Sequence, residues 1–185
     1  MNEEIPKILT ELEKISLDSK EKFAHLSAVQ FNWKPSAESW SVGQCFAHLV
    51  KTNESFFPIL DDIAQGKRKN SLWENYSPLT KFFGRRVVGA LKSTTRKFPA
   101  PKDIRPSESA IELSVIDEFI EQQREVAAKI KATENLDWQK IVLTSPFFGL
   151  ITYNLRDGYK VFVTHAQRHL RQAENVMQAE EFPKN

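Results

Sequence analysis

Three of the four histidines lie in two short stretches whose spacing could build a metal site. His48 follows the run Trp-Ser-Val-Gly-Gln at 40–44, and His165 and His169 are four positions apart. On a helix, residues at that separation share one face, with Cβ atoms about 5–6 Å apart. Two such imidazoles can share one ion through metal–nitrogen bonds of about 2.0–2.1 Å. His48, on a facing helix, would then be a third ligand.

Each of these histidines also has a simpler interpretation. Histidines at the edge of a core are usually hydrogen-bonded to a carbonyl or hydroxyl group and bind nothing else. Cys45, one turn before His48, could act as a soft ligand, although buried cysteines commonly have no chemical role. His25 lies outside both stretches and is expected at the surface or in packing. The spacing alone leaves the metal site and the packed histidines both open.

The elements that must position these stretches are amphipathic helices. Apolar residues recur at three- and four-residue intervals in four segments, which predicts four helices. The segments are approximately 3–31, 41–65, 107–131 and 154–180. Ser41 is a good N-cap with Gln44 at the third helical position, as a capping box requires. Asn154 or its neighbour Thr152 can cap the last helix. Together they predict an all-α fold, a four-helix bundle with long crossing connections, in a single domain over 1–185.

The connections carry the least regular sequence. Residues 66–106 mix aromatic and basic side chains, and a short helix within 78–98 would be weakened by Gly84 and Gly89. Such an insertion is often a lid or the rim of a binding site, or else a loop covering one end of the bundle. In the connection 132–154, the β-branched run 141–144 could be extended. Before the second helix, Trp33 and Trp40 are expected to pack at the bundle end.

Composition and charge narrow the classes of function. The net charge of +2 demands neither nucleic acid nor an anionic membrane as a partner. The basic run 67–70 is expected to be a solvated loop. The acidic start 1–4 lacks an apolar signal core, and no apolar run approaches the ~20 residues that span a bilayer. A single cysteine excludes an internal disulfide and fits a reducing compartment. We therefore expect a cytoplasmic protein.

The residues around the histidines resemble the DinB/YfiT-like superfamily. The likeness rests on 40–44 followed by His48, on the HxxxH pair followed by Arg171-Gln172, on Phe31-Asn32-Trp33-Lys34-Pro35, and on Pro146-Phe147-Phe148-Gly149 with Thr152. It covers nearly the whole chain, although the insertion 66–106 is not diagnostic. The resemblance implies a four-helix bundle with long crossing connections and a divalent metal held by three histidines. The matching positions here are His48, His165 and His169.

The resemblance also implies which metal and which chemistry to expect. Zinc or nickel comes first as the metal, with iron as a further option. Relatives include S-transferases that use low-molecular-weight thiols, and others are described as metal-dependent hydrolases. Three nitrogen ligands leave an open coordination position, which is typical of catalytic sites. The ion can lower the pKa of bound water toward about 7 or hold a thiolate. We therefore predict a metal-dependent enzyme that activates a thiol or water for attack on a small electrophile.

Few residues beyond the ligands can be given roles from the sequence. Gln44, Thr52 and Gln172 lie one turn from a predicted ligand and could orient it, or could be caps and surface residues. A cofactor carboxylate could be held by Arg168, Arg85 and Arg86. No general base stands out, because Asp157 and Glu174 resemble surface charges, so no catalytic residue is assigned.

Two other classes of protein compete with the enzyme. One is a non-catalytic, metal-binding stress-response bundle, as a monomer or a homodimer, in which the ion only joins two helices. The other is a nucleic-acid-associated repair protein. The low net charge and the lack of a base-reading motif count against that third class.

Overall fold

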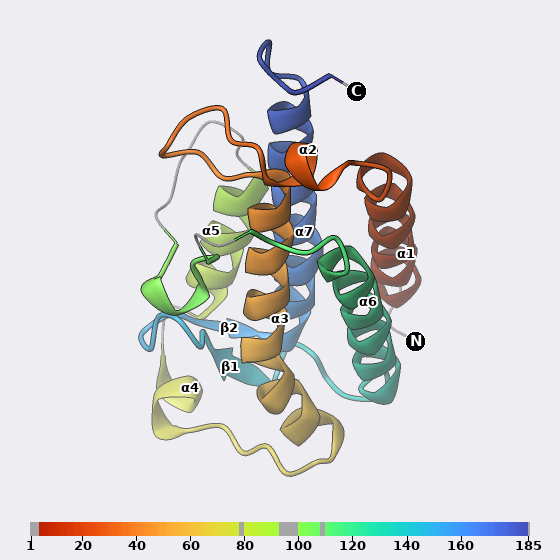
Figure 1. The fold of residues 1–185 in the computed structure, drawn as a ribbon. Coiled ribbons are helices and arrows are strands. Elements are labelled where there is room, and N and C mark those ends of the chain that lie inside the picture. The colour runs from red at the N-terminus through yellow and green to blue at the C-terminus, as the bar shows by residue number, and fades with distance from the viewer. Residues whose placement is uncertain (1–3, 78–79, 93–99, 108–109, 185) are drawn as a thin grey trace.

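The computed structural model describes residues 4–77, 80–92, 100–107 and 110–184. Its four longest helices are α1 (Glu4–Phe23), α3 (Val42–Ala64), α6 (Val115–Ala132) and α7 (Leu155–Met177), which form the bundle in Figure 1. The predicted fold class, an all-α four-helix bundle, is confirmed. No helix in this described part of the chain is both long enough and apolar enough to cross a membrane.

The order of the helices around the bundle explains two of the three long connections between them, those from α1 to α3 and from α6 to α7. Helix α1 packs against α6 and α7, and α3 packs against the same two helices. Helices α1 and α3, which follow one another in sequence, therefore lie diagonally across the bundle, and so do α6 and α7. The connections between them must cross the bundle ends, as the sequence predicted. Helix α2 (Ala28–Asn32) lies in the first of these crossings.

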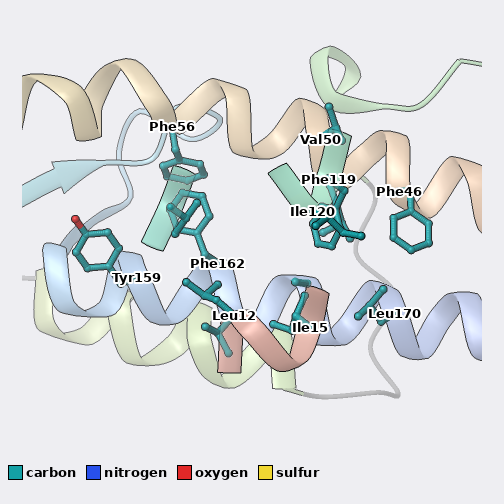
Figure 2. Close-up of a cluster of buried hydrophobic side chains, with 14 of the residues drawn as sticks. Leu12, Ile15, Phe46, Val50, Phe56, Phe119, Ile120, Tyr159, Phe162 and Leu170 are labelled. Atoms are coloured by element: carbon teal, nitrogen blue, oxygen red, sulfur yellow. The ribbon is translucent and has the colours of Figure 1, made fainter. Parts of the chain in front are cut away.

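Aromatic packing holds the four long helices in place (Figure 2). The fully buried Phe46 of α3 makes edge contacts with Phe23 of α1 and Phe119 of α6, at centroid distances of 5.3 and 5.5 Å. Phe56 of α3 meets Phe162 of α7 at 5.3 Å. Rings of this size dominate core energetics because each buries about 150–250 Å². They hold α3 and α7 beside each other, which brings the two predicted histidine stretches onto facing helices.

Both predicted helix caps that matter for these stretches are present. The Ser41 hydroxyl accepts a hydrogen bond from the Gln44 amide at 3.1 Å, and the Ser41 amide donates to Gln44 Oε1 at 3.2 Å. Asn154, rather than Thr152, caps α7, and its side chain accepts from the Asp157 amide at 2.8 Å. These bonds satisfy amides that have no partner within a first helical turn. They determine where the two histidine-bearing helices begin.

The single helix predicted over 3–31 is wrong. Helix α1 ends at Phe23, and α2 begins separately after Ser27. Ser27 and Gln30 form a complete capping box, which starts a new helix instead of continuing the old one. Residue 3 itself lies outside the described residues.

The third helix also begins later than predicted, at Val115 instead of Ser107. The backbone before it is bound by side chains of other elements. Ile111 donates its amide to Asn32 Oδ1 at 2.7 Å, and its carbonyl accepts from Asn32 Nδ2 at 3.0 Å. A backbone amide and carbonyl engaged in this way are not available for a helical turn.

The insertion 66–106 contains three short elements, α4 (Leu72–Tyr76), α5 (Thr80–Lys92) and the 3₁₀ turn η1 (Lys102–Ile104). The helix expected within 78–98 is present, although positions 78–79 and 93–98 lie outside the described residues. Helix α5 packs along α7 and against the strand β2. A Cβ atom at Gly84 would collide with the Asp157 carboxylate of α7. The glycine that weakens α5 on its own is therefore what allows this close packing.

A small hairpin closes one end of the bundle. Strands β1 (Val142–Thr144) and β2 (Thr152–Asn154) pair antiparallel, and the extended segment expected at 141–144 is confirmed. Helix α4 lies against β1, where the Thr144 hydroxyl donates to the buried Glu74 at 2.9 Å. Arg68 forms an ion pair with the same carboxylate, so the basic run is not wholly a solvated loop.

Candidate metal centre

The three predicted histidines meet between α3 and α7. Nε2 of His165 lies 3.2 Å from Nε2 of His48 and 3.1 Å from Nε2 of His169. One nitrogen from each of the three rings lies within 4.8 Å of the others. The structure therefore brings together the three histidines that the sequence proposed as ligands. In the described part of the chain this cluster contains histidine only, and Cys45 is not a member.

Hydrogen bonds at Nδ1 determine the tautomer and the orientation of two of the three rings. His48 Nδ1 lies 2.8 Å from the Ile104 carbonyl oxygen, and His169 Nδ1 lies 3.0 Å from Gln172 Oε1. Both oxygens are acceptors only, so both rings carry their proton on Nδ1. Their Nε2 lone pairs then point toward His165. A neutral His165 can donate from Nε2 to only one of them, so the cluster has more acceptors than protons. A cation satisfies such an arrangement.

The spacing of the nitrogens also fits a metal ion. Nitrogens bound at about 2.0–2.1 Å around a tetrahedral ion lie about 3.4 Å apart. The two Nε2–Nε2 distances of 3.1 and 3.2 Å are close to this value. His48 and His169 are 3% and 7% exposed, and His165 is half-buried, so His165 is the most exposed of the three residues. Three nitrogens would leave one position of a tetrahedral ion for another molecule.

Burial keeps all three imidazoles neutral. It lowers the pKa of His48, an effect that the Ile104 hydrogen bond partly opposes. Burial, with smaller effects from His48 and Arg168, lowers the pKa of His165 to about 3. Burial, with smaller effects from His165, His48 and Arg168, holds the pKa of His169 well below its ordinary value. Neutral imidazole is the form that binds metals, so the site is ready for a cation at neutral pH.

Trp40 covers one side of the cluster. Its ring centroid lies 4.9 Å from that of His48 and 5.6 Å from that of His169, and it is nearly parallel to the His169 ring at 21°. The sequence predicted only that Trp40 packs at the bundle end. It does border the core, but half-buried and directly against two of the three histidines. The sequence shows Trp40 just before the cap of α3, but not which rings it meets.

Of the three residues proposed to orient the ligands, one contacts an imidazole and the other two contact only backbone groups. Gln172 does contact a ligand, through His169 Nδ1. Thr52 instead donates to the His48 carbonyl at 2.8 Å, so it touches the backbone and not the imidazole. Gln44 caps α3 and donates from Nε2 to the Ser107 carbonyl at 2.9 Å. Cys45 is 1% exposed in the core, where burial raises the pKa of its thiol, and this fits a packing role.

The charged candidates have separate surroundings. Arg168 is half-buried, and its charge lowers the pKa of both His165 and His169, so a cation lies near the cluster. Arg85 and Arg86 are exposed on α5, and no described contact connects them with the histidines. Glu174 pairs with Lys22 of α1 at 2.7 Å, which leaves it an unsuitable general base.

The Ile104 carbonyl is a functional group that sequence reasoning missed. It belongs to η1, at the end of the insertion, 56 positions from His48. Three side chains on one stripe of α3 hold this segment by its carbonyls. Gln44 bonds to Ser107, His48 to Ile104, and Lys51 to Arg105 at 3.2 Å. The end of the insertion therefore forms part of the wall of the site. A main-chain acceptor leaves no side-chain signal in the sequence.

A four-helix bundle with three convergent histidines on facing helices defines the class of protein, and sequence comparison agrees. The profile of the DinB superfamily matches residues 19–173, so the chain belongs to this superfamily. A similar solved structure is that of YfiT from Bacillus subtilis, described as a probable metal-dependent hydrolase with an unusual four-helix bundle topology. The two share 15% sequence identity and a TM-score of 0.60 over 96% of this chain and 88% of YfiT. At this identity the likeness shows the fold alone. No curated protein matches the sequence.

Proposed function

We propose that this protein is an enzyme that uses a divalent transition metal, held by His48, His165 and His169, to activate a small nucleophile. The nucleophile is a low-molecular-weight thiol or water, and its target is an electrophilic small molecule. The observation that carries the proposal is the convergence of three Nε2 atoms, two of them oriented by acceptors on the outer nitrogens. Imidazole ligands suit zinc, nickel and iron, and the family resemblance puts zinc and nickel first and iron as a further option.

The surroundings of the cluster support catalysis over a purely structural ion. Structural zinc sites are usually closed by four protein ligands, whereas catalytic sites have three and an open position. Among the described residues, the cluster offers three ligands and no fourth. A bound ion would supply positive charge that stabilises the deprotonated nucleophile.

The composition of the cluster favours a thiol over water. A free thiol has a pKa of about 8.5, so contact with a cation is enough to ionise it. Water bound to such an ion has a pKa of about 7–9, so at neutral pH it is at best about half ionised. Among the described residues, no carboxylate belongs to the cluster. Thiol transfer is therefore the first activity to test, and hydrolysis, the activity attributed to YfiT, is the second.

The first test is elemental analysis by mass spectrometry on tag-free protein. Wild-type protein should contain about one transition-metal ion per chain. The variants His48→Ala, His165→Ala and His169→Ala should each lose it and remain helical by circular dichroism. His25→Ala is the matched control, because His25 is exposed and outside the cluster. Stoichiometric metal in all three variants would mean that the ion binds elsewhere.

Activity is tested on protein loaded with each metal in turn. Low-molecular-weight thiols are offered with a bimane electrophile, and ester hydrolysis is measured in parallel. Turnover that requires both the metal and His165 supports an enzyme. Metal binding with no turnover of any substrate would support the competing proposal, a non-catalytic bundle in which the ion only joins α3 and α7.

A further inference from the structure

The end of the insertion, residues 100–107, is bound along helix α3 beside the metal centre, and we call this segment the strap. It contains the 3₁₀ turn η1, which packs against α3. Ile104 and Pro106 are buried, whereas Arg105 and Ser107 are exposed, so the strap turns alternate residues toward the protein. Ile104 is 5% exposed, yet it lies outside the main hydrophobic core of the described residues. Its burial therefore depends on where the strap lies and not on the packing of the bundle.

Three side chains of α3 hold the strap by its carbonyl oxygens, and the central one is a predicted metal ligand. His48 Nδ1 lies 2.8 Å from the Ile104 carbonyl oxygen. Gln44, one turn before His48, and Lys51, one turn after it, donate to two further strap carbonyls at 2.9 and 3.2 Å. The strap is therefore fastened to α3 on both sides of the ligand.

The central bond connects the strap with the ion. An ion bound at Nε2 of His48 confines the ring proton to Nδ1, where it is donated to the Ile104 carbonyl. In the metal-free protein the proton can instead occupy Nε2, because His165 Nε2 lies 3.2 Å away and can accept it. The Nδ1 lone pair then faces the Ile104 oxygen, and two acceptors form no hydrogen bond. The strap and the ion therefore stabilise the same tautomer of His48.

We infer that Gln44 and Lys51 are positioning residues of the metal centre, which act on the ion through the strap. Their donors bind the strap and not the imidazoles, and they keep the Ile104 carbonyl where it orients His48. Because coupling between two binding events is reciprocal, the ion in turn holds the strap on α3. The inference rests on the metal centre of the proposed function, but it does not depend on catalysis.

The charge of Lys51 gives the opposite expectation, and this makes the residue informative. Burial is the main cause of the low pKa of His48, and the positive charge of Lys51 lowers that pKa further. Lys51 therefore lies within electrostatic range of the site, and through charge alone its removal would strengthen the binding of a cation. Through the strap, its removal weakens binding. The sign of the change separates positioning from simple electrostatics.

The first measurement is zinc affinity, by competition with a chromophoric chelator. Gln44→Glu keeps the oxygen that accepts from the Ser41 amide, so the capping box remains, but it replaces the donor to the strap by an acceptor. Lys51→Met removes the other donor and keeps an unbranched side chain. Each should weaken zinc binding by about 2–30-fold, although each makes the site more negative by one charge.

Two control variants accompany this measurement. Lys51→Arg retains a donor and the positive charge, so it should bind zinc like wild-type protein. Lys131→Met makes the same change of charge at an exposed position on α6, outside the strap and the site, and should also leave the affinity unchanged. Circular dichroism should show the same helix content in all four variants.

Hydrogen exchange, measured by mass spectrometry, reports on the strap itself. The amides of Ile104 and Arg105 donate within η1, to the carbonyls of residues 101 and 102 at 3.2 Å, so they report whether the turn is formed. Zinc should slow their exchange in wild-type protein by about tenfold, and should slow it less in Gln44→Glu and Lys51→Met. The Ser145 amide, in the distant hairpin, is the internal control and should be slowed far less.

The outcomes separate this inference from the proposed function. Zinc that binds both variants as tightly as wild-type protein, or more tightly, overturns the inference and leaves the metal centre intact. Zinc that binds wild-type protein without slowing exchange in the strap does the same. Failure of wild-type protein to bind zinc, nickel or iron would overturn the proposed function, and the inference with it.

Discussion

The two ends of helix α3 depart from ordinary burial in opposite ways. Near its N-terminal end, three polar imidazoles are drawn together beneath Trp40, and two of them are almost fully buried. Beyond its C-terminal end, five large apolar side chains are left in contact with water: Leu72, Trp73, Tyr76, Phe148 and Leu150. Each arrangement costs free energy in the isolated, metal-free chain, and each becomes favourable when a missing component is added. In our proposal a cation is the component for the first end, and cover from solvent would be the component for the other.

The largest effect expected from this comparison is stabilisation by metal. A ligand present at about 1,000 times its Kd stabilises the folded state by about 4 kcal/mol. For a chain of this size that raises Tm by roughly 8–16 °C. Differential scanning calorimetry with zinc or nickel, and then with a chelator, measures the shift. Leu72→Glu should retain the full shift and His165→Ala should lose it, and equal shifts in both would contradict the separation of the two ends.

The stability of the metal-free protein should depend on pH because of the histidine end. A histidine whose pKa is lower in the folded chain than in the unfolded chain binds fewer protons when folded. Its contribution is therefore complete above the unfolded pKa of about 6.5 and falls as the pH is lowered. The decline continues to the folded pKa, which is about 3 for His165.

Urea unfolding in chelator at several pH values measures this dependence. His165→Leu should show a shallower decline than wild-type protein. Leu72→Glu, at the other end, should retain the decline attributed to the histidines. A steep, unchanged decline in His165→Leu would show that other groups cause it.

A smaller effect is expected from the residue that orients His169. Gln172→Leu removes the acceptor on Nδ1 and lets the ring change tautomer, so metal affinity should fall by about 10–100-fold. Gln172→Glu keeps an oxygen acceptor at the same place and should restore most of the affinity. Competition with a chromophoric chelator gives both values. Equal losses in the two variants would mean that Gln172 acts only through packing.

The smallest effect concerns Trp40. An imidazole that binds a divalent ion becomes more positive, and an indole face stabilises positive charge by about 0.5–2 kcal/mol. Trp40→Leu should therefore weaken metal binding by about 3–30-fold, and Trp40→Phe should weaken it less. Nickel should also quench tryptophan emission in wild-type protein more than in Trp40→Phe. Unchanged affinity in Trp40→Leu would limit the indole to shielding the site from water.

What could be predicted from the sequence were the local features. The HxxxH spacing and the Ser41–Gln44 capping box depend on residues three or four positions apart. At that separation, helix geometry determines which side chains contact each other. The same rule would have found the break after α1, because Ser27 and Gln30 have the spacing of a capping box. The late start of α6 could not be found in this way, because Asn32, far away in sequence, binds the backbone at Ile111.

The sequence by itself therefore determined the chemical type of the site and the two helices that carry it. Only the tertiary structure decided that the three Nε2 atoms converge, because that depends on the Ile104 carbonyl and on the packing of α3 against α7. It also decided which side chains of α4 are exposed at the other end of the molecule. Glu74 turns inward to Arg68 and Thr144, and its apolar neighbours are left exposed. In both cases the reason is that main-chain acceptors and long-range partners determine where a side chain points, and neither follows from local periodicity.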